Sequence, residues 1–389
     1  MYSQEDLNSA VAAGAISAEA ASALRAHVAA TKEQVPADAE HFRLITGFND
    51  IFVSIGIVIL LLAVAAIGQA IGGAFVDAPN IFSMSVDSTP AQFEEASRLN
   101  ALNNGLEMVF GALFVAGAAW ALAEFFTRKR RMALPSILLL LAFIGGALFT
   151  QIGGILALNY ENGLGDRVGA VLLAAAGVVT AALAWMHWRR FMVPITIAAG
   201  TAALAITAIA LILAAIGPES DYAGDIVLAL VFVAGLVIFA FAMRWDISDP
   251  ARETRRSDVA FWLHLLAAPM IAHPVFYFIG VIDGDNIGAG AGLLVVGIYV
   301  LFGLVALAID RRALLVSALA YVLIALTILF REFGAVELNF ALTALVIGSA
   351  LLTLSALWTP IRAAVVKALP EGMRARLPAT VPATSAAVA

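Results

Sequence analysis

The chain contains ten apolar stretches, each long enough to cross a membrane, and this feature restricts its fold more than any other. They cover approximately residues 51–75, 106–127, 133–156, 168–188, 191–216, 226–243, 259–281, 287–309, 313–330 and 340–359. A helix needs about 20 apolar residues to cross about 30 Å of hydrocarbon. Hydrophobic residues make up 62% of the chain and charged residues 13%, whereas soluble domains have about 45–50% and about 25%. We therefore expect an all-α, polytopic transmembrane helix bundle of about ten spans.

The connectors between the predicted spans alternate in charge. One set, together with both termini, carries 19 of the 22 lysines and arginines, and the other set carries only Arg98, Arg167 and Arg331. Short loops rich in Lys and Arg stay in the cytoplasm, so the basic connectors and both termini are predicted to be cytoplasmic. The expected location is the bacterial cytoplasmic (inner) membrane, and the lipid bilayer is the first expected partner.

Paired arginines recur in the basic connectors and indicate a repeat. The pairs are Arg130–Arg131, Arg189–Arg190, Arg255–Arg256 and Arg311–Arg312, and their spacings are 59, 66 and 56 residues. Twice the pair precedes a proline at the same offset, in RRMALPSI and RRFMVPIT. The pattern is that of a two-helix hairpin that turns at a basic corner. The orientation rule alone would also place arginines at every corner, so true duplication and simple orientation both stay open.

The two ends of the chain differ in character from the spans. Residues 1–35 predict a small cytoplasmic helical hairpin and 36–50 a linker. The bundle follows over 51–359, and 360–389 form a basic, then disordered, cytoplasmic tail. A hairpin of this size is not stable alone. We therefore expect it to lean on the membrane domain or to bind a cytoplasmic protein partner.

Helix signals are clear at two places outside the spans. Gly14 fits a helix stop, and Ser17 fits the N-cap of a second helix with Glu19 in its first turn. In the long outer connector, Thr89 and Gln92 form a capping-box pattern around a proline. This second signal predicts a short helix lying on the outer membrane surface.

The N-terminal segment LNSAVAAGAISAEAASALRAH resembles the helical hairpin of an uncharacterised family of bacterial multi-pass membrane proteins. That hairpin has a Gly-x-Ile-Ser/Thr-x-Glu turn, which Gly14, Ile16, Ser17 and Glu19 match. The stretch FTQIGGILAL (149–158) is similar to a glutamine-containing span of the same family. The resemblance implies a bundle of many spans behind the hairpin. It implies no chemistry, because the family has no established activity.

Few polar side chains fall within the predicted spans, and such groups are candidates for function because they are costly in lipid. The candidates for a polar cavity or transport path are Gln69, Glu107, Gln151, Asn159 and His273. Each glutamine closely precedes a Gly-Gly pair, a pattern that also fits close helix packing. Glu107 also fits an interfacial side chain. Glu124 stands four residues before Arg128, so an ion pair at the interface is expected.

The seventh predicted span holds two histidines and two prolines, in FWLHLLAAPMIAHPVFYF. His264 and His273 are nine residues apart, so on a straight helix they face opposite ways, about 13.5 Å apart along the axis. They cannot bind one metal ion together. His273 is expected to face the bundle interior, where its ring can find a partner, and His264 to be structural. We also expect a kink near Pro269 or Pro274.

These features favour some functional classes over others. The chain has no cysteine, which excludes disulfides and thiol chemistry. The sequence shows no catalytic motif or metal cluster, so no enzyme, cofactor, metal or nucleic-acid partner is expected. The favoured function is a small-solute transporter or permease. The alternative is a non-transporting scaffold or sensor that recruits a partner through residues 1–35. A polar cavity lined by Gln69, Gln151 and His273 would favour transport, and a dry packed core would favour the scaffold.

The charge asymmetry yields a topology that can be tested with reporter fusions. Fusions after Arg131, Arg190, Arg256 and Arg312 should report the cytoplasm, and fusions within 78–88, at Asn162 and at Gly284 should report the outside. The reason is the concentration of Lys and Arg on one side. A single reversed assignment would mean that a span has been miscounted.

Overall fold

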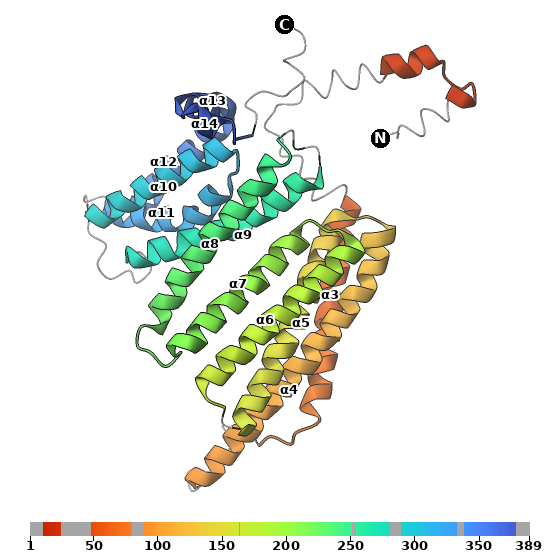
Figure 1. Cartoon of the computed structure of the whole chain (residues 1–389), viewed down its shortest axis with the longest axis vertical. Helices are drawn as coiled ribbons and strands as arrows, with labels where there is room; N and C mark the ends of the chain where they lie inside the picture. The colour runs from red at the N-terminus through yellow and green to blue at the C-terminus, as the bar shows by residue number, and fades with distance from the viewer. Residues whose placement is uncertain are drawn as a thin grey trace.

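A computed structural model describes residues 11–24, 48–79, 89–162, 164–250, 252, 254–280, 289–332 and 338–378, without the side chains of 159–162, 289 and 332. Ten of its helices are long and apolar enough to cross a membrane, which confirms the predicted number (Figure 1). In chain order they are α3 (Phe48–Gly73), α4 (Pro90–Ala123), α5 (Ala133–Asn162), α6 (Asp166–Phe191), α7 (Ile195–Ile216), α8 (Ala223–Ile247), α9 (Arg255–Phe278), α10 (Ala289–Ile309), α11 (Ala313–Glu332) and α12 (Asn339–Ala356). A π-helical segment, η2 (Glu124–Lys129), extends α4, and α13 (Trp358–Ala368) and α14 (Glu371–Arg374) follow α12.

The outward faces of these helices are apolar. On α3, for example, Phe52, Ile59 and Leu62 are 73%, 62% and 67% exposed. Large exposed apolar surfaces are unfavourable in water but suit the hydrocarbon of a bilayer. The all-α fold, the ten apolar helices and these faces identify the chain as a multi-pass integral membrane protein.

Consecutive helices pack as hairpins, and the turns of four hairpins share one backbone feature. The pairs are α4/α5, α6/α7, α8/α9 and α10/α11. The described non-glycine residues with positive φ are Arg131 (53°), Met192 (55°), Arg252 (57°) and Asp310 (59°), one in each turn. These positions are 61, 60 and 58 residues apart, a more even spacing than that of the arginine pairs. Because this conformation costs roughly 1–2 kcal/mol for a non-glycine residue, its regular recurrence supports a repeated two-helix unit.

The four turns lie at one end of the bundle, which we call the arginine-rich end. Residues of the first two turns and of the start of α9 line a single cleft. Arg252 of the third turn donates a hydrogen bond to Asp310 of the fourth, at 2.8 Å. Figure 1 shows α3 to α9 side by side, with α10, α11 and α12 grouped beyond α8 and α9 and α13 next to the end of α12. The structure thus brings together basic hairpin turns that are about sixty residues apart in the sequence.

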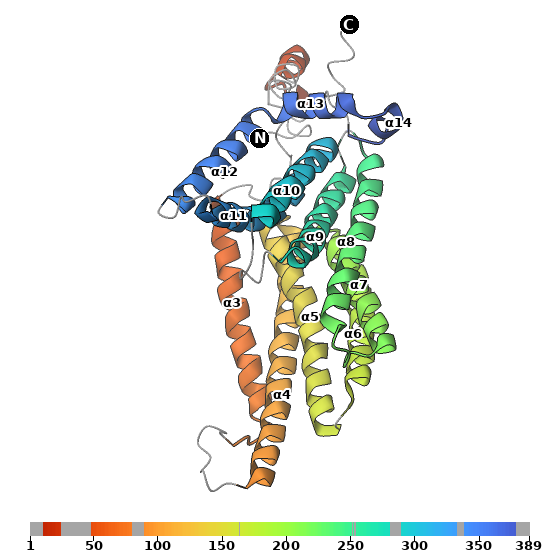
Figure 2. The same ribbon diagram turned by 90° about the vertical axis from the view of Figure 1, so that its left-hand side faces the viewer.

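The prediction of a short surface helix beginning near Thr89 is wrong about the length of that helix. The capping box itself is confirmed, since the Gln92 backbone N–H donates to the Thr89 hydroxyl and the Gln92 side chain accepts from the Thr89 N–H. However, the helix continues unbroken from Pro90 to Ala123, and Figure 2 shows α4 extending beyond the end of α3. No proline interrupts the helix after Pro90, and Gly105 packs against α5, so nothing ends the helix before the apolar span.

The predicted turn near the N-terminus is confirmed in residues 11–24. Gly14 has a φ of +71°, and the Ser17 hydroxyl accepts a hydrogen bond from the Ala20 N–H at 3.0 Å. Gly14 therefore ends one helical segment and Ser17 caps the next. The remainder of the predicted hairpin lies outside the described residues.

Glycines allow the first three spans to approach closely. A Cβ atom at Gly72 of α3 would lie 2.5 Å from the Leu106 carbonyl oxygen of α4. A Cβ atom at Gly153 of α5 would lie 2.8 Å from the Gly105 carbonyl oxygen of α4. Both glycines follow one of the two candidate glutamines, so one glycine of each Gly-Gly pair serves close helix packing, as small residues do in membranes.

Two adjacent glycines of α5 provide a matched test of this packing. Gly153→Ala should destabilise the bundle by about 1–3 kcal/mol, because the added methyl meets the backbone of α4. Gly154→Ala should be neutral or slightly stabilising, since nothing lies within 4 Å of its Cβ position and Ala favours helix. Thermal unfolding in detergent micelles would measure both changes. Equal effects of the two variants would contradict the close α4/α5 contact.

Candidate functional site

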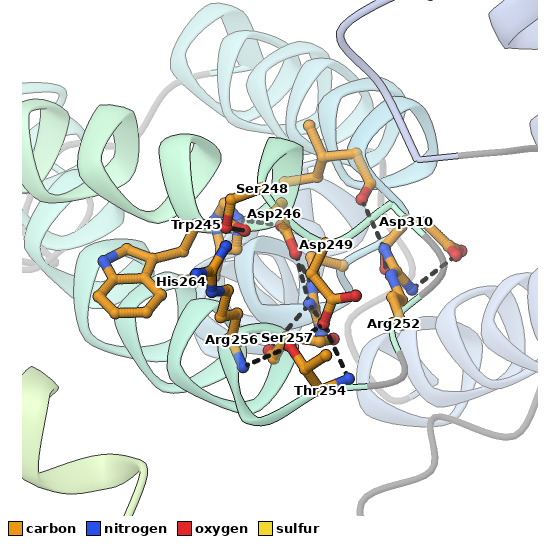
Figure 3. Close-up of polar contacts among 12 residues, drawn as sticks. Trp245, Asp246, Ser248, Asp249, Arg252, Thr254, Arg256, Ser257, His264 and Asp310 are labelled. Atoms are coloured by element: carbon orange, nitrogen blue, oxygen red, sulfur yellow. Dashed lines mark hydrogen bonds and ion pairs between the residues drawn. The ribbon is translucent and has the colours of Figure 1, made fainter.

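A buried charge cluster, formed by Asp246, Ser257, His264 and Arg311, joins three elements at the arginine-rich end. Figure 3 shows Asp246 of α8 and His264 of α9 facing one another. His264 Nε2 lies 2.8 Å from Asp246 Oδ2, and Arg311 donates to Asp246 Oδ1 at 2.6 Å. The exposed fractions of Asp246, His264 and Arg311 are only 2%, 2% and 4%. The charges are therefore paired away from solvent, as buried ionic groups require.

Local structure explains why cations gather at Asp246. The carboxylate stands in the last turn of α8, where the helix carbonyls already carry partial negative charge. An acidic group there is unfavourable unless cations compensate it. Arg311, from the α10–α11 turn, supplies that charge and also donates to the carbonyl and hydroxyl oxygens of Ser257, at 3.1 and 3.2 Å. One arginine thus connects α8, α9 and the fourth turn.

A second group, the corner clamp, surrounds Asp310 and consists of Arg252, Asp310, Trp358 and Arg362. Arg252 and the Trp358 indole donate to the Asp310 carboxylate at 2.8 and 2.7 Å, and Arg362 lies 3.5 Å from it. Burial lowers the pKa of Arg252 and the nearby charge of Arg311 lowers it further, although Asp310 opposes both. The guanidinium remains charged at neutral pH. The clamp fixes α13 to the third and fourth hairpin turns.

Only one of the two ring nitrogens of His264 has a hydrogen-bond partner among the described residues. Its Nδ1 is buried and has no hydrogen-bond partner among the described residues. A neutral imidazole donates from one nitrogen and accepts at the other, so a proton on Nε2 suits Asp246 and leaves the Nδ1 lone pair unused. Ser257 lies seven residues before His264, about 10.5 Å along the helix axis, and its hydroxyl accepts from Arg311. Within the described residues, the cluster is a clamp and not a Ser-His-Asp relay.

The described candidates for a polar path form no hydrogen bonds with one another. Gln69 is exposed on α3. Glu107 accepts a hydrogen bond from Asn103 one turn earlier on α4, at 2.8 Å. Gln151 donates to the Thr180 hydroxyl of α6 at 3.0 Å, so it links two helices. The side chain of Asn159 lies outside the described residues.

The predicted interior position of His273 is wrong. His273 is exposed at the bundle surface, where its Nδ1 lies 2.6 Å from the Tyr321 hydroxyl of α11. The two histidines contact different helices, because α9 turns the side of His264 towards α8, whereas His273 contacts α11. That side also carries Ala267 and Ile271, which are buried. The expected hydrogen-bond partner exists, although at the surface, and α9 continues as one helix through Pro269 and Pro274.

Several polar contacts escaped sequence analysis. The expected Glu124–Arg128 pair is confirmed at 3.3 Å, but Arg190 binds Glu124 more closely, with bonds of 2.7 and 2.9 Å. His187 of α6 is 1% exposed and its Nδ1 lies 3.3 Å from the Thr196 hydroxyl. Asp246 lies outside the predicted spans, in the connector between 226–243 and 259–281. The sequence did hold one signal. Asp246 lies only three residues after the predicted span 226–243, and a carboxylate so close to the hydrocarbon needs a cationic partner such as an arginine.

The buried charge cluster can be tested by removing one or both partners. Asp246→Asn should cost about 3–5 kcal/mol, because it leaves Arg311 buried without its counter-charge. The double variant Asp246→Asn/Arg311→Met should lose less than the single variant. Unfolding in detergent would measure both. Glu219→Gln is the matched control, since it breaks an exposed pair with Arg167 and should change stability little. If the control and Asp246→Asn behaved alike, the cluster would not hold the helices together.

Comparison of the chain with protein-family models, with curated proteins and with solved structures found no match. The resemblance to a bacterial membrane family therefore stays a prediction. The function has to be inferred from the geometry of the arginine-rich end and from the membrane fold.

Proposed function

We propose that the protein is a membrane-embedded scaffold or sensor whose working surface is its arginine-rich end. One observation carries this choice over small-solute transport, the function that the sequence favoured. No described polar side chain expected to line a path hydrogen-bonds to another of them, whereas the charged side chains of the hairpin turns pair with one another. Gln151 and His273 are hydrogen-bonded to α6 and α11, respectively.

The packing of α9 adds support, because a solute path needs polar groups across the membrane. Beyond His264, the buried side chains of α9 are Ala267, Ala268, Ile271, Ala272, Pro274 and Phe276. All of them except Pro274 belong to one apolar core with residues of α8, α10 and α11. An apolar core of this kind suits a rigid support better than a permeation route.

The arginine-rich end offers an ordered surface for a partner. Trp358 and Arg362 of α13 are 4% and 5% exposed, so this amphipathic helix is held against the bundle and not left free. The N-terminal hairpin precedes the first span and, in this proposal, recruits a cytoplasmic protein. In a permease, by contrast, the arginine-rich end would serve only to anchor the protein at the membrane surface.

Orientation and location form part of the same proposal. The excess of Lys and Arg in the hairpin turns supports a cytoplasmic position for the arginine-rich end and both termini, in a bacterial inner membrane. The role is proposed to be non-enzymatic. The described residues contain no group of three or more metal-ligating side chains placed to hold an ion.

Deletion of residues 1–35 separates recruitment from folding. A labelling enzyme fused after residue 389 would record neighbouring proteins in cells. The deletion should abolish a specific set of neighbours while membrane insertion and the unfolding temperature stay unchanged, because every span begins after residue 47. Removal of residues 379–389 is the control and should keep the neighbours. Purified protein in liposomes should not raise permeability to glycerol, amino acids or monosaccharides.

Two results would count against this function. Solute entry into the liposomes that exceeds that of protein-free vesicles would favour a permease. Neighbours that are the same with and without residues 1–35 would remove the hairpin from recruitment.

A further inference from the structure

The arginine-rich end contains a basic cleft of about 570 Å³ between the first two hairpin turns and the start of α9. Its wall includes four arginines, Arg128, Arg131, Arg190 and Arg255, against one carboxylate, Asp258. Glu124 does not line the cleft but pairs with Arg128 and Arg190. With Glu124 included, the four arginines and two carboxylates give the site a formal charge of +2. The cleft is therefore suited to an anion.

Two of the arginines remain available to a ligand. Arg131 and Arg255 are exposed and form no ion pair with any other described residue. Arg190 is held in place by its two bonds to Glu124, which leaves further donors of the guanidinium free to point elsewhere. The planar guanidinium matches the oxygens of a phosphate with paired hydrogen bonds.

The backbone adds to this positive potential. Three helices begin at the cleft, because residues of the first turns of α5, α7 and α9 or their caps line it, including Ala133, Pro194 and Arg255. The first N–H groups of a helix lack partners within the helix, and the helix dipole is positive at this end. The repeated hairpins direct these helix starts to the same end of the bundle, so they act on one site together.

Thr127 supplies an independent sign of a missing partner. Its side chain lines the cleft and is only 8% exposed, yet its hydroxyl has no hydrogen bond to any described residue. A threonine in a helix commonly donates to the carbonyl four residues earlier, and Thr127 stands instead in the π-helical η2. Leaving a buried hydroxyl unpaired is costly. The oxygen itself is closed to solvent in this rotamer, so a ligand oxygen pairs with it once the side chain rotates towards the cleft, which would remove that cost.

The apolar part of the wall places the anion at a membrane surface. Met132, Ile137, Val193 and Trp262 line the cleft together with the arginines. The cleft also lies at the ends of spans, where tryptophan commonly marks the boundary between hydrocarbon and water. We propose that the basic cleft binds a phosphate-bearing anion, either the headgroup of an anionic phospholipid or a soluble phosphoester. This inference does not depend on the proposed scaffold function.

Native mass spectrometry of the full-length protein in detergent would test this site. The probes are short-chain phosphatidylglycerol, short-chain phosphatidylcholine and glycerol 3-phosphate. The cleft pair Arg131→Gln/Arg255→Gln should weaken binding of the anionic probe at least tenfold, since hydrogen bonds to charged groups are strong. The control pair Arg189→Gln/Arg244→Gln removes the same charge from exposed residues that do not line the cleft and should retain affinity.

A second variant guards against loss of fold. Thr127→Val keeps the shape of the side chain and removes a hydroxyl that has no partner, so the unfolding temperature without ligand should not fall. Affinity for the anionic probe should drop about tenfold if the hydroxyl binds the phosphate. A normal affinity in Thr127→Val together with a normal affinity in the cleft pair would overturn the proposal.

The three probes distinguish the source of the phosphate. Binding of phosphatidylglycerol alone supports a lipid headgroup, and equal binding of glycerol 3-phosphate supports a soluble ligand. The proposal fails if neither anionic probe binds more tightly than phosphatidylcholine. It also fails if the cleft pair and the control pair lose the same affinity.

Discussion

The absence of water from the hydrocarbon layer is the constraint on which the rest of this structure depends. Backbone polar groups in lipid must be paired within the segment, so every span is a helix. Apolar side chains such as Phe52 and Ile59 can then face outwards at no cost. Most ionisable side chains collect at the ends of the spans. The chain also has to reverse within a few residues at each end, which explains the left-handed backbone at Arg131, Met192, Arg252 and Asp310.

The polar features of the protein follow from this repeated reversal. Each hairpin turn carries arginines and starts a new helix, so cationic side chains and helix N-termini accumulate at one end. Acids offset part of that charge, as Asp246 does inside the bundle and Asp310 does in the corner clamp. Between the first two turns and α9 the compensation is incomplete, and the basic cleft remains. The same hairpin turns thus produce both the paired charge groups and the basic cleft. The difference is the number of carboxylates that lie near the arginines at each place.

Sequence reasoning succeeded where the physical cause is local. The ten spans follow from length and hydropathy, the Thr89–Gln92 box from a capping pattern, and the Glu124–Arg128 pair from helical spacing. It failed where a third element decides the outcome. Arg190 lies 66 residues from Glu124 yet is its closer partner. The helix that starts at Pro90 was expected on the surface, because the pattern shows where a helix begins but not how far it projects.

The amino-acid sequence alone determined the membrane environment, the number of spans, the N-terminal turn and the different orientations of His264 and His273, because these depend on composition and on the helical period. Only the tertiary structure decided which of the two histidines is buried. The helical period fixes the angle between two side chains but not which side meets a neighbour. That choice depends on how α9 packs against α8, where Asp246 pairs with His264 and is itself held by Arg311. The basic cleft was decided in the same way, since its walls come from segments that are distant in the chain.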